Sequence, residues 1–282
     1  MPTSPQSPTI AGSSRTENIL VTIKAYPNPS SQYIETVCVA GITDSGNFIR
    51  LYPIPFRDLE YDQQFRVFNW IEATVAKKSK DYRKESHSIV PASIKVGAHV
   101  GTENQWAVRR SIIDPLVSPS IEALQDQFAQ DHTSLGIIRP KTIKRLIIKK
   151  EALQWTPAEL AKLRQRTLFD AIDEQGTEEA IRDLEKIPFR FQYEFVCDDQ
   201  RCKGHTFSVI SWEVMQSYRK WRQDYGDAQW EAKFRQKYEQ ELLDDHHDLH
   251  FFVGTVFQHP LVWGINGLFY PPKTTVVQPS LF

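Results

Sequence analysis

The most constraining feature of this sequence is a series of short runs that alternate apolar and polar residues between turn-forming residues. Alternation with a period of two is typical of strands that bury one face. PFRFQYEFVC (188–197) alternates in this way, and the strand-like runs ETVCVAGIT (35–43) and NFIRLYPI (47–54) meet at DSGN, a turn signal. The first hundred residues predict about five short strands, the number found in a small barrel or sandwich.

Helical periodicity appears between and after these strands. PSIEALQDQFAQ (119–130) and WEVMQSYRKWRQDY (212–225) space their apolar residues by three or four, and Ser118 or Ser120 would cap the first of them. We therefore predict a β-rich α+β fold with two β units and attached helices. The predicted divisions are a disordered tail over 1–17, an N-terminal unit over 18–151, a C-terminal unit over 152–272 and an extended tail over 273–282.

Charge and composition limit the classes of partner. The net charge of −1 excludes a polycation that binds nucleic acid by charge alone. Residues 1–150 nevertheless carry an excess of five basic residues and residues 151–282 an excess of six acidic ones, so an anionic partner would meet the first part, unless the split is only drift in surface composition. There is no secretory signal pattern and no apolar run of bilayer length, and three cysteines make no disulfide framework. We expect a cytoplasmic protein with no membrane partner.

Several long stretches resemble one uncharacterised bacterial family, described as a dual OB-fold-containing domain. They are KAYPNPSSQYIETVCVAGITDSGNFIRLYPIPFRDL, SLGIIRPKTI, FVCDDQRCKGHTFSVISWE and GLFYPPK. The resemblance implies two small OB-like β-barrels of nucleic-acid-binding type, in a context of DNA maintenance or anti-phage defence. It implies no catalytic residues.

Three basic segments are candidates for binding single-stranded nucleic acid, with DNA and RNA both open: two of them, 47–57 and 77–84, contain aromatic residues, and the third, 139–150, contains no acidic residue. OB-type barrels hold strands with a basic groove and with aromatic faces that stack bases, worth about 1–3 kcal/mol per base. Core packing of the aromatic residues and solvated strand faces are the alternative explanation. The candidate residues are Arg50, Arg57, Lys77, Lys78, Lys80, Tyr82, Arg83, Arg139, Lys141, Lys144 and Arg145.

The stretch CDDQRCKGH places Cys197, Cys202 and His205 in one turn between two strands, at a spacing found among zinc ligands. Zinc takes four ligands, and the fourth would come from Asp198 or from the histidines of LDDHHDLH (243–250). The alternative is a hairpin with free cysteines and a histidine bonded to the backbone.

Catalytic signatures are scarce. The sequence has no glycine-rich phosphate loop, no GxSxG and no HExxH. His205 and Glu213 remain as a pair that a metal-dependent nuclease could use. We interpret the protein as a binding module rather than an enzyme, with the nuclease and a pure protein-interaction subunit of a defence complex as alternatives.

The chain ends in QPSLF, which resembles the short peptide that docks bacterial proteins on the DNA polymerase sliding clamp. Gln278, Leu281 and Phe282 match that peptide, and Pro279 stands where an aliphatic residue is commoner. An extended peptide gains affinity by placing Leu and Phe in an apolar pocket of its partner. The alternative is a tail that folds back on its own surface.

Overall fold

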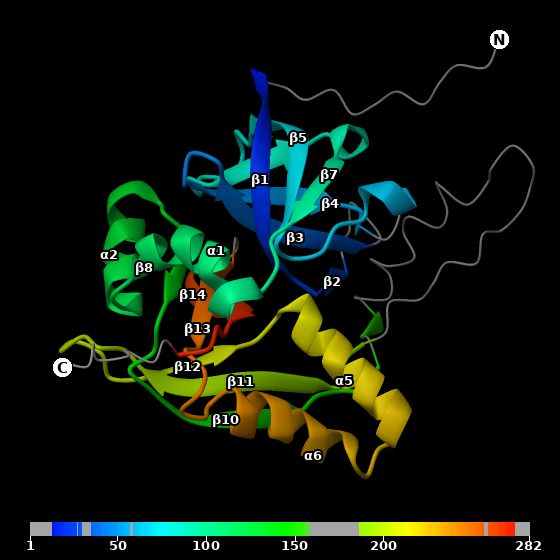
Figure 1. Cartoon of the computed structure of the whole chain (residues 1–282), viewed down its shortest axis with the longest axis vertical. Coiled ribbons are helices and arrows are strands. Elements are labelled where there is room, and N and C mark those ends of the chain that lie inside the picture. The colour runs from blue at the N-terminus through cyan, green and yellow to red at the C-terminus, as the bar shows by residue number, and fades with distance from the viewer. Residues whose placement is uncertain are drawn as a thin grey trace, which may run out of the picture.

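The computed structural model describes residues 13–26, 28–29, 35–56, 59–154, 156–157, 186–256 and 259–273. The fold is β-rich α+β, as predicted (Figure 1). Most of the predicted tails, residues 1–12 and 274–282, and the candidate Arg57 lie outside the described residues.

The first unit is a closed barrel of five strands. Their order is β1–β3–β4–β6–β5, and β5 pairs with β1 to close the barrel. Within the barrel only the β4–β6 pair is parallel. The barrel strands are β1 (Ser14–Lys24), β3 (Glu35–Thr43), β4 (Phe48–Ile54), β5 (Asn69–Lys77) and β6 (Ser86–Ile89).

The predicted hairpin at DSGN is confirmed. β3 and β4 pair antiparallel, and the amide of Asn47 donates to the hydroxyl of Thr43 at the turn. Gly46 has a φ of 79°, a conformation that glycine adopts without strain. The sequence chemistry of this turn is sufficient to place it.

Two predictions near this barrel are wrong. Residues 14–17, placed in the disordered tail, are the start of β1 and pair with residues 73–76 of β5. The β-type run HSIVPASIKV (87–96) predicts one strand, but this stretch is interrupted by a 3-10 turn at Pro91–Ser93 and continues as β7 (Lys95–His99). Proline has no amide hydrogen for a strand ladder, which explains the interruption.

The second unit contains two sheets. A three-stranded antiparallel sheet has the order β10–β11–β12, and a four-stranded sheet has the order β14–β13–β9–β8. A bridge between Val209 and Ile265 joins them, and no pairing among the described residues closes them into a second barrel. The strands are β8 (Val117–Ser118), β9 (Leu135–Ile138), β10 (Thr142–Lys150), β11 (Phe189–Val196), β12 (His205–Ser208), β13 (His250–Val256) and β14 (His259–Phe269).

The strand pairing divides the chain earlier than the predicted boundary at 151. β9 pairs with β13 and β10 with β11, although both precede residue 151. The division therefore falls between β7 and β8. A short strand β2 (Asn28–Pro29) pairs with β3 on the barrel side.

Four α-helices are described, and both predicted helices are among them. Ser120 caps α2, because its hydroxyl accepts from the amide of Ala123, whereas Ser118 lies in β8. The helices are α1 (Glu103–Ile113), α2 (Ile121–Asp131), α5 (Trp212–Tyr225) and α6 (Trp230–Arg235), and α6 continues as one π-helical turn over Gln236–Glu241.

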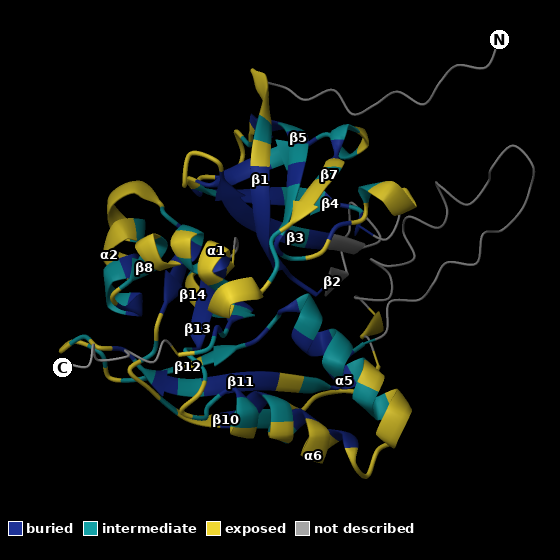
Figure 2. Ribbon diagram, viewed as in Figure 1, coloured by how far each residue is buried: buried dark blue, intermediate teal, exposed yellow. Residues whose placement is uncertain are grey.

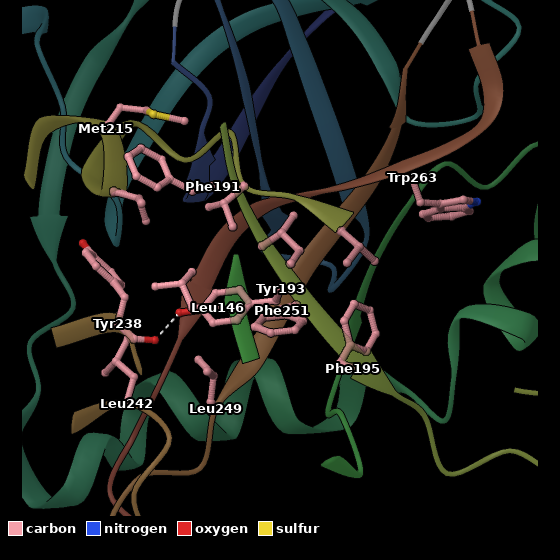
Figure 3. Close-up of a cluster of buried hydrophobic side chains, with 14 of the residues drawn as sticks. Leu146, Phe191, Tyr193, Phe195, Met215, Tyr238, Leu242, Leu249, Phe251 and Trp263 are labelled. Carbon is pink, nitrogen blue, oxygen red and sulfur yellow. Dashed lines mark hydrogen bonds between the residues drawn. The ribbon is translucent and has the colours of Figure 1, made fainter. Parts of the chain in front are cut away.

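Aromatic side chains dominate the core of the second unit. The rings of Phe191 and Phe234 stack with centroids 4.2 Å apart, and those of Tyr193 and Phe251 stack at 5.2 Å. The hydroxyl of Tyr193 donates to the carbonyl of Tyr238, 2.6 Å away (Figure 3). This bond satisfies a buried polar group and anchors the π-helical turn on β11.

A separate buried cluster lies between the two units. Ala40 and Ile42 of the barrel share it with Leu135, Ile137 and other apolar residues of the second unit. Figure 2 shows β3 of the barrel and β13 of the second unit as largely buried. Burial of a large aliphatic side chain stabilises by about 1.5–3 kcal/mol, so the two units form one packed body.

Candidate functional site: a cationic pocket between the two units

Two of the predicted nucleic-acid-binding residues are buried, which contradicts a surface role. Arg50 is 3% exposed, and its guanidinium donates to the carbonyl and hydroxyl of Ser134. Arg83 is 7% exposed and forms a bidentate ion pair with Asp81. Both arginines brace the barrel against the second unit, since Arg83 also donates to the carbonyl of Thr255.

The other residues of the KKSKDYRK segment contribute mainly to the hairpin itself. Lys77 donates to two carbonyls of the same hairpin, and the ammonium of Lys78 lies 4.7 Å from the ring centroid of Tyr52. Tyr82 is 41% exposed, and its ring packs edge-on against Phe128. Lys80 is exposed.

The basic residues at and near β10 are exposed but paired with acids. Arg139 pairs with Asp248 at 2.6 Å and Lys141 with Asp198 at 2.7 Å. Lys144 and Arg145 both pair with Glu194. β10 lies far from the barrel hairpin in Figure 1, so the predicted residues do not form one continuous surface.

A cavity of about 330 Å³ lies between the barrel and the second unit. Its wall is built from β1, the turn before β5, β7, α1, the first turn of α5, and β14. The charged or titratable side chains of the wall include Lys24, Arg66, His99, Arg109 and Glu213. We refer to this cavity as the interdomain pocket.

Lys24, the last residue of β1, is 6% exposed. Its ammonium lies 4.2 Å from the ring centroid of Phe56 and 4.8 Å from that of Trp212. Its one hydrogen bond to a described residue is a long contact of 3.5 Å to the carbonyl of Phe65. Burial lowers the pKa of the Lys24 ammonium, although the carboxylate of Glu213 opposes this shift. Two aromatic faces therefore stabilise this cation.

Arg109 is also buried, at 7% exposure. Its guanidinium carbon lies 3.8 Å from the ring centroid of Phe68 and 4.8 Å from that of Trp106. It donates to the carbonyl of Val100 and to Nε2 of His99, which must accept because arginine has only donors. Desolvation and the neighbouring charge of Arg109 lower the pKa of His99 from its ordinary value.

The three cations of the interdomain pocket have no ion-pair partner among the described residues. Within the described part of the chain, no carboxylate lies within 4.0 Å of Lys24, Arg66 or Arg109. Thr22, another wall residue, keeps its buried hydroxyl without a hydrogen-bond partner among the described residues. Buried charges and hydroxyls are costly when unpaired, so this wall is suited to an anionic ligand that bears hydrogen-bonding groups.

Backbone strain accumulates beside the same pocket. Asn104, Gln105 and Trp106 have φ values of 50°, 56° and 63°, three successive left-handed residues at the start of α1. Each costs about 1 kcal/mol or more, and such strain gathers at functional sites. The ring of Trp106 packs against Phe269 and Tyr270, and these contacts hold it in the wall.

His205 and Glu213 do not form the predicted catalytic pair. The hydroxyl of Ser211 donates to Glu213, which lines the interdomain pocket. His205 is absent from that wall and instead contacts Glu122 and Cys202. The expected nuclease arrangement is therefore wrong for this pair.

The three predicted metal ligands do come together. Cys197, Cys202 and His205 converge with Glu122 of α2, and the four ligand atoms lie within 4.8 Å of one another. Burial raises the pKa of the Cys197 thiol to about 12. The cluster could hold a metal ion, and its fourth member is Glu122.

The fourth ligands predicted from sequence are not members of this cluster. Asp198 pairs with Lys141, His247 bonds to Asp244, and His250 bonds to a backbone carbonyl. Glu122 lies 75 residues before Cys197, so no local spacing in the sequence links the two.

Residues 117–282 match the model of a family described as Domain of unknown function (DUF8757). The chain belongs to this family. Residues 15–115 match a second model, Domain of unknown function (DUF8758), and the division between the two models agrees with the strand pairing.

Other comparisons add little. A search of curated proteins found no significant match. A solved structure of a murine DNA-binding protein bound to double-stranded DNA shares 9% identity, with 92% of this chain and 96% of that chain covered and a TM-score of 0.27. Among the described residues, no helix is both long and apolar enough to cross a membrane.

Proposed function

We propose that this protein binds nucleic acid, and that the interdomain pocket receives one nucleotide unit. The observation that carries the proposal is the convergence of Lys24, Arg66 and Arg109, unpaired within the described chain, on one cavity that aromatic rings also line. A buried cation without a counterion favours a bound anion, and phosphate is the anion common to all nucleic acids.

The remaining wall residues fit the other parts of a nucleotide. Trp106 and Tyr270 offer ring surface for a base, and the carboxylate of Glu213 accepts hydrogen bonds from a sugar hydroxyl or a base amino group. The volume of about 330 Å³ is near the lower end of the range for small-molecule sites. The ligand is therefore one unit: a free nucleotide, a strand end or an extruded base.

The barrel fits a role in nucleic-acid binding, but the face that such barrels usually use for it is covered by the second unit. A closed five-stranded barrel with one parallel pair is consistent with an OB-type barrel, whose second and third strands and fourth connecting loop usually contact the nucleic acid. Here those strands are β3 and β4, and their residues Ala40, Ile42 and Arg50 pack on the second unit. Nucleic acid would have to bind beside that contact, and we assign it to the interdomain pocket.

The test is a set of calorimetric titrations of the full chain with inorganic phosphate, a nucleoside, the corresponding nucleoside 5′-monophosphate and short ssDNA, dsDNA and RNA oligonucleotides, at two salt concentrations. We expect the monophosphate to bind more tightly than either of its parts and to compete with the preferred oligonucleotide. Affinity should fall with salt, because phosphate contacts release counterions.

A matched pair of variants locates the site. Arg66→Gln removes an exposed pocket cation that has no ion pair in the described chain, and Arg145→Gln removes an arginine paired with Glu194. We expect R66Q to weaken binding about tenfold, as for loss of one charge-assisted contact, and R145Q to leave it nearly unchanged. The binding site would lie elsewhere if R66Q left oligonucleotide affinity unchanged and the monophosphate did not compete with the oligonucleotide. Absence of any nucleic-acid binding would favour a protein-interaction subunit.

The context of DNA maintenance or anti-phage defence, and recruitment to the sliding clamp through QPSLF, are part of the same proposal. Gln278, Leu281 and Phe282 lie outside the described residues, so the support is their match to the clamp-binding peptide. Titration of a purified bacterial clamp with the full chain and with L281A/F282A tests it. Equal binding of both chains would remove the clamp from the proposal.

A further inference from the structure

We propose that Glu122, Cys197, Cys202 and His205 bind one Zn²⁺ ion as a closed structural centre. This inference goes beyond the proposed function, because the cluster lies outside the interdomain pocket and its test requires no nucleic acid. Three of the ligands, Cys197, Cys202 and His205, were predicted from the sequence. The fourth is the carboxylate of Glu122 in α2, which no spacing in the sequence reveals.

The distances are close to those that zinc requires. Nε2 of His205 lies 3.4 Å from Sγ of Cys202 and 3.0 Å from Oε1 of Glu122. With Zn–S near 2.3 Å and Zn–N or Zn–O near 2.0–2.1 Å, the edges of a tetrahedral site are about 3.3–3.8 Å. Since all four ligand atoms already lie within 4.8 Å of one another, ligation requires shifts of about 1 Å.

Local structure holds the cysteine turn ready for this geometry. Gly204 has a φ of 99°, which turns the chain back between Cys202 and His205. The backbone amide of Cys197 donates to Sγ of Cys202 at 3.2 Å, a bond that fixes the position of this sulfur within the turn. The turn thus presents its three ligands on one side.

Outer contacts tie the same turn to α2. The hydroxyl of Ser120, which caps α2, donates to Asp199, and Arg201 pairs with Asp126. These bonds place Glu122, in the first turn of α2, next to His205. Such surrounding bonds orient metal ligands and are a regular part of metal sites.

The chemistry of the donors selects zinc over the common hard cations. Two thiols and an imidazole suit zinc, whereas calcium and magnesium require oxygen ligands. Oε2 of Glu122 is buried and has no hydrogen-bond partner among the described residues, so the carboxylate is incompletely satisfied without a ligand. Four protein ligands leave no position for water, which makes the site structural rather than catalytic.

A zinc ion here would fasten α2 to the β11–β12 turn. The far end of α2 contacts the barrel hairpin, since the rings of Phe128 and His132 pack edge-on against Tyr82. The centre would therefore also stabilise the contact between the two units.

The experiment is metal analysis of the full chain purified without chelator, with cobalt substitution of the metal-free protein. We expect one zinc per chain. Cobalt should show thiolate charge-transfer absorption and the intense visible bands of a tetrahedral site. Chelation should lower the melting temperature, because a ligand of the native state is removed.

Variants separate this centre from a simple His205–Glu122 bond. C202S should lose the metal, and E122Q should weaken zinc affinity by at least about tenfold, the lower end of what even outer-shell partners cost. C38S is the matched control, because Cys38 is a free cysteine outside the cluster, and it should keep one zinc.

Three results would overturn the proposal. The first is a wild-type chain that contains no zinc and does not bind added zinc saturably. This test uses no variant, so it does not depend on whether a variant folds. The second is E122Q binding zinc as tightly as wild type, which would leave an open three-ligand site. The third is a disulfide between Cys197 and Cys202 in chain purified under reducing conditions.

Discussion

The cations of β10 and those of the interdomain pocket differ in what surrounds them. On β10, Lys144 and Arg145 are exposed, and both pair with Glu194 of the neighbouring strand. In the pocket, Lys24 and Arg109 are buried against aromatic rings, with no ion pair in the described chain. The sequence suggests the β10 cations as the anion-binding site, whereas the structure suggests the pocket cations.

The contrast shows that local density of basic residues is a poor guide to where an anion binds. A surface ion pair contributes about 0–1 kcal/mol and neutralises the charge that a phosphate would meet. A desolvated cation without a counterion has an unmet electrostatic requirement, which a ligand can supply. The sharpest tests therefore compare paired with unpaired cations.

The largest expected effect is the loss of stability when a buried, paired cation is removed. Arg83→Met would leave Asp81 buried without its cation, and we expect a loss of about 3–5 kcal/mol in the free energy of unfolding by urea. D81N/R83M, which removes both charges, should recover a large part of that loss. Equal losses in the single and double variants would mean that the ion pair is not the source of the stability.

The next effect is on a buried cation that is unpaired. Lys24→Met should weaken nucleoside monophosphate binding by about 30-fold, equivalent to about 2 kcal/mol for one desolvated charge contact. Stability should change by less than about 1 kcal/mol, because relief of the buried charge offsets the lost contacts with Phe56 and Trp212. Calorimetry and urea unfolding of the same preparation measure both. A large loss of stability with unchanged affinity would make Lys24 a structural residue.

The same lysine predicts a smaller dependence on pH. Burial lowers the pKa of folded Lys24 below 10.5, its value in the unfolded chain, so between these two values the unfolded chain binds more protons. Stability attributable to Lys24 should rise with pH across that window, while nucleotide affinity falls as the cation is lost. The measurement is the difference between wild type and K24M in the free energy of unfolding and in nucleotide affinity, at neutral pH and at about pH 10. Identical pH profiles for the two proteins would contradict it.

The smallest effect is expected on the exposed, paired cations. K144Q/R145Q should change the free energy of unfolding by less than about 1 kcal/mol and oligonucleotide affinity by less than about twofold. Gel-shift titration at low salt is the most sensitive check, because it exaggerates surface electrostatics. A tenfold loss in this variant would restore the surface predicted from the sequence.

Much of the fold was predictable because its signals are local. The hairpin over 35–54, the α2 cap at Ser120 and the helix 212–225 each depend on neighbouring residues, and each is present. The start of β1 was missed because Ser14–Glu17 carries no apolar pattern, and its pairing with β5 decides its structure.

The candidate sites were only partly predictable. Cys197, Cys202 and His205 lie within nine residues and were found, whereas Glu122 was not. Lys24 and Arg66 have no basic neighbour in their segments, Arg109 is followed by Arg110, and no spacing rule connects the three.

The sequence by itself determined the elements, the turns and the cysteine–histidine part of the metal cluster, because each depends on residues close together in the chain. Only the tertiary structure decided which charged side chains find partners. Arg145 of β10 pairs with Glu194, and the barrel residues Arg50 and Arg83 bond to the carbonyls of Ser134 and Thr255 in the second unit. The physical reason is that charge pairing and burial depend on distance in space, and packing of the two units brings distant residues within a few ångströms.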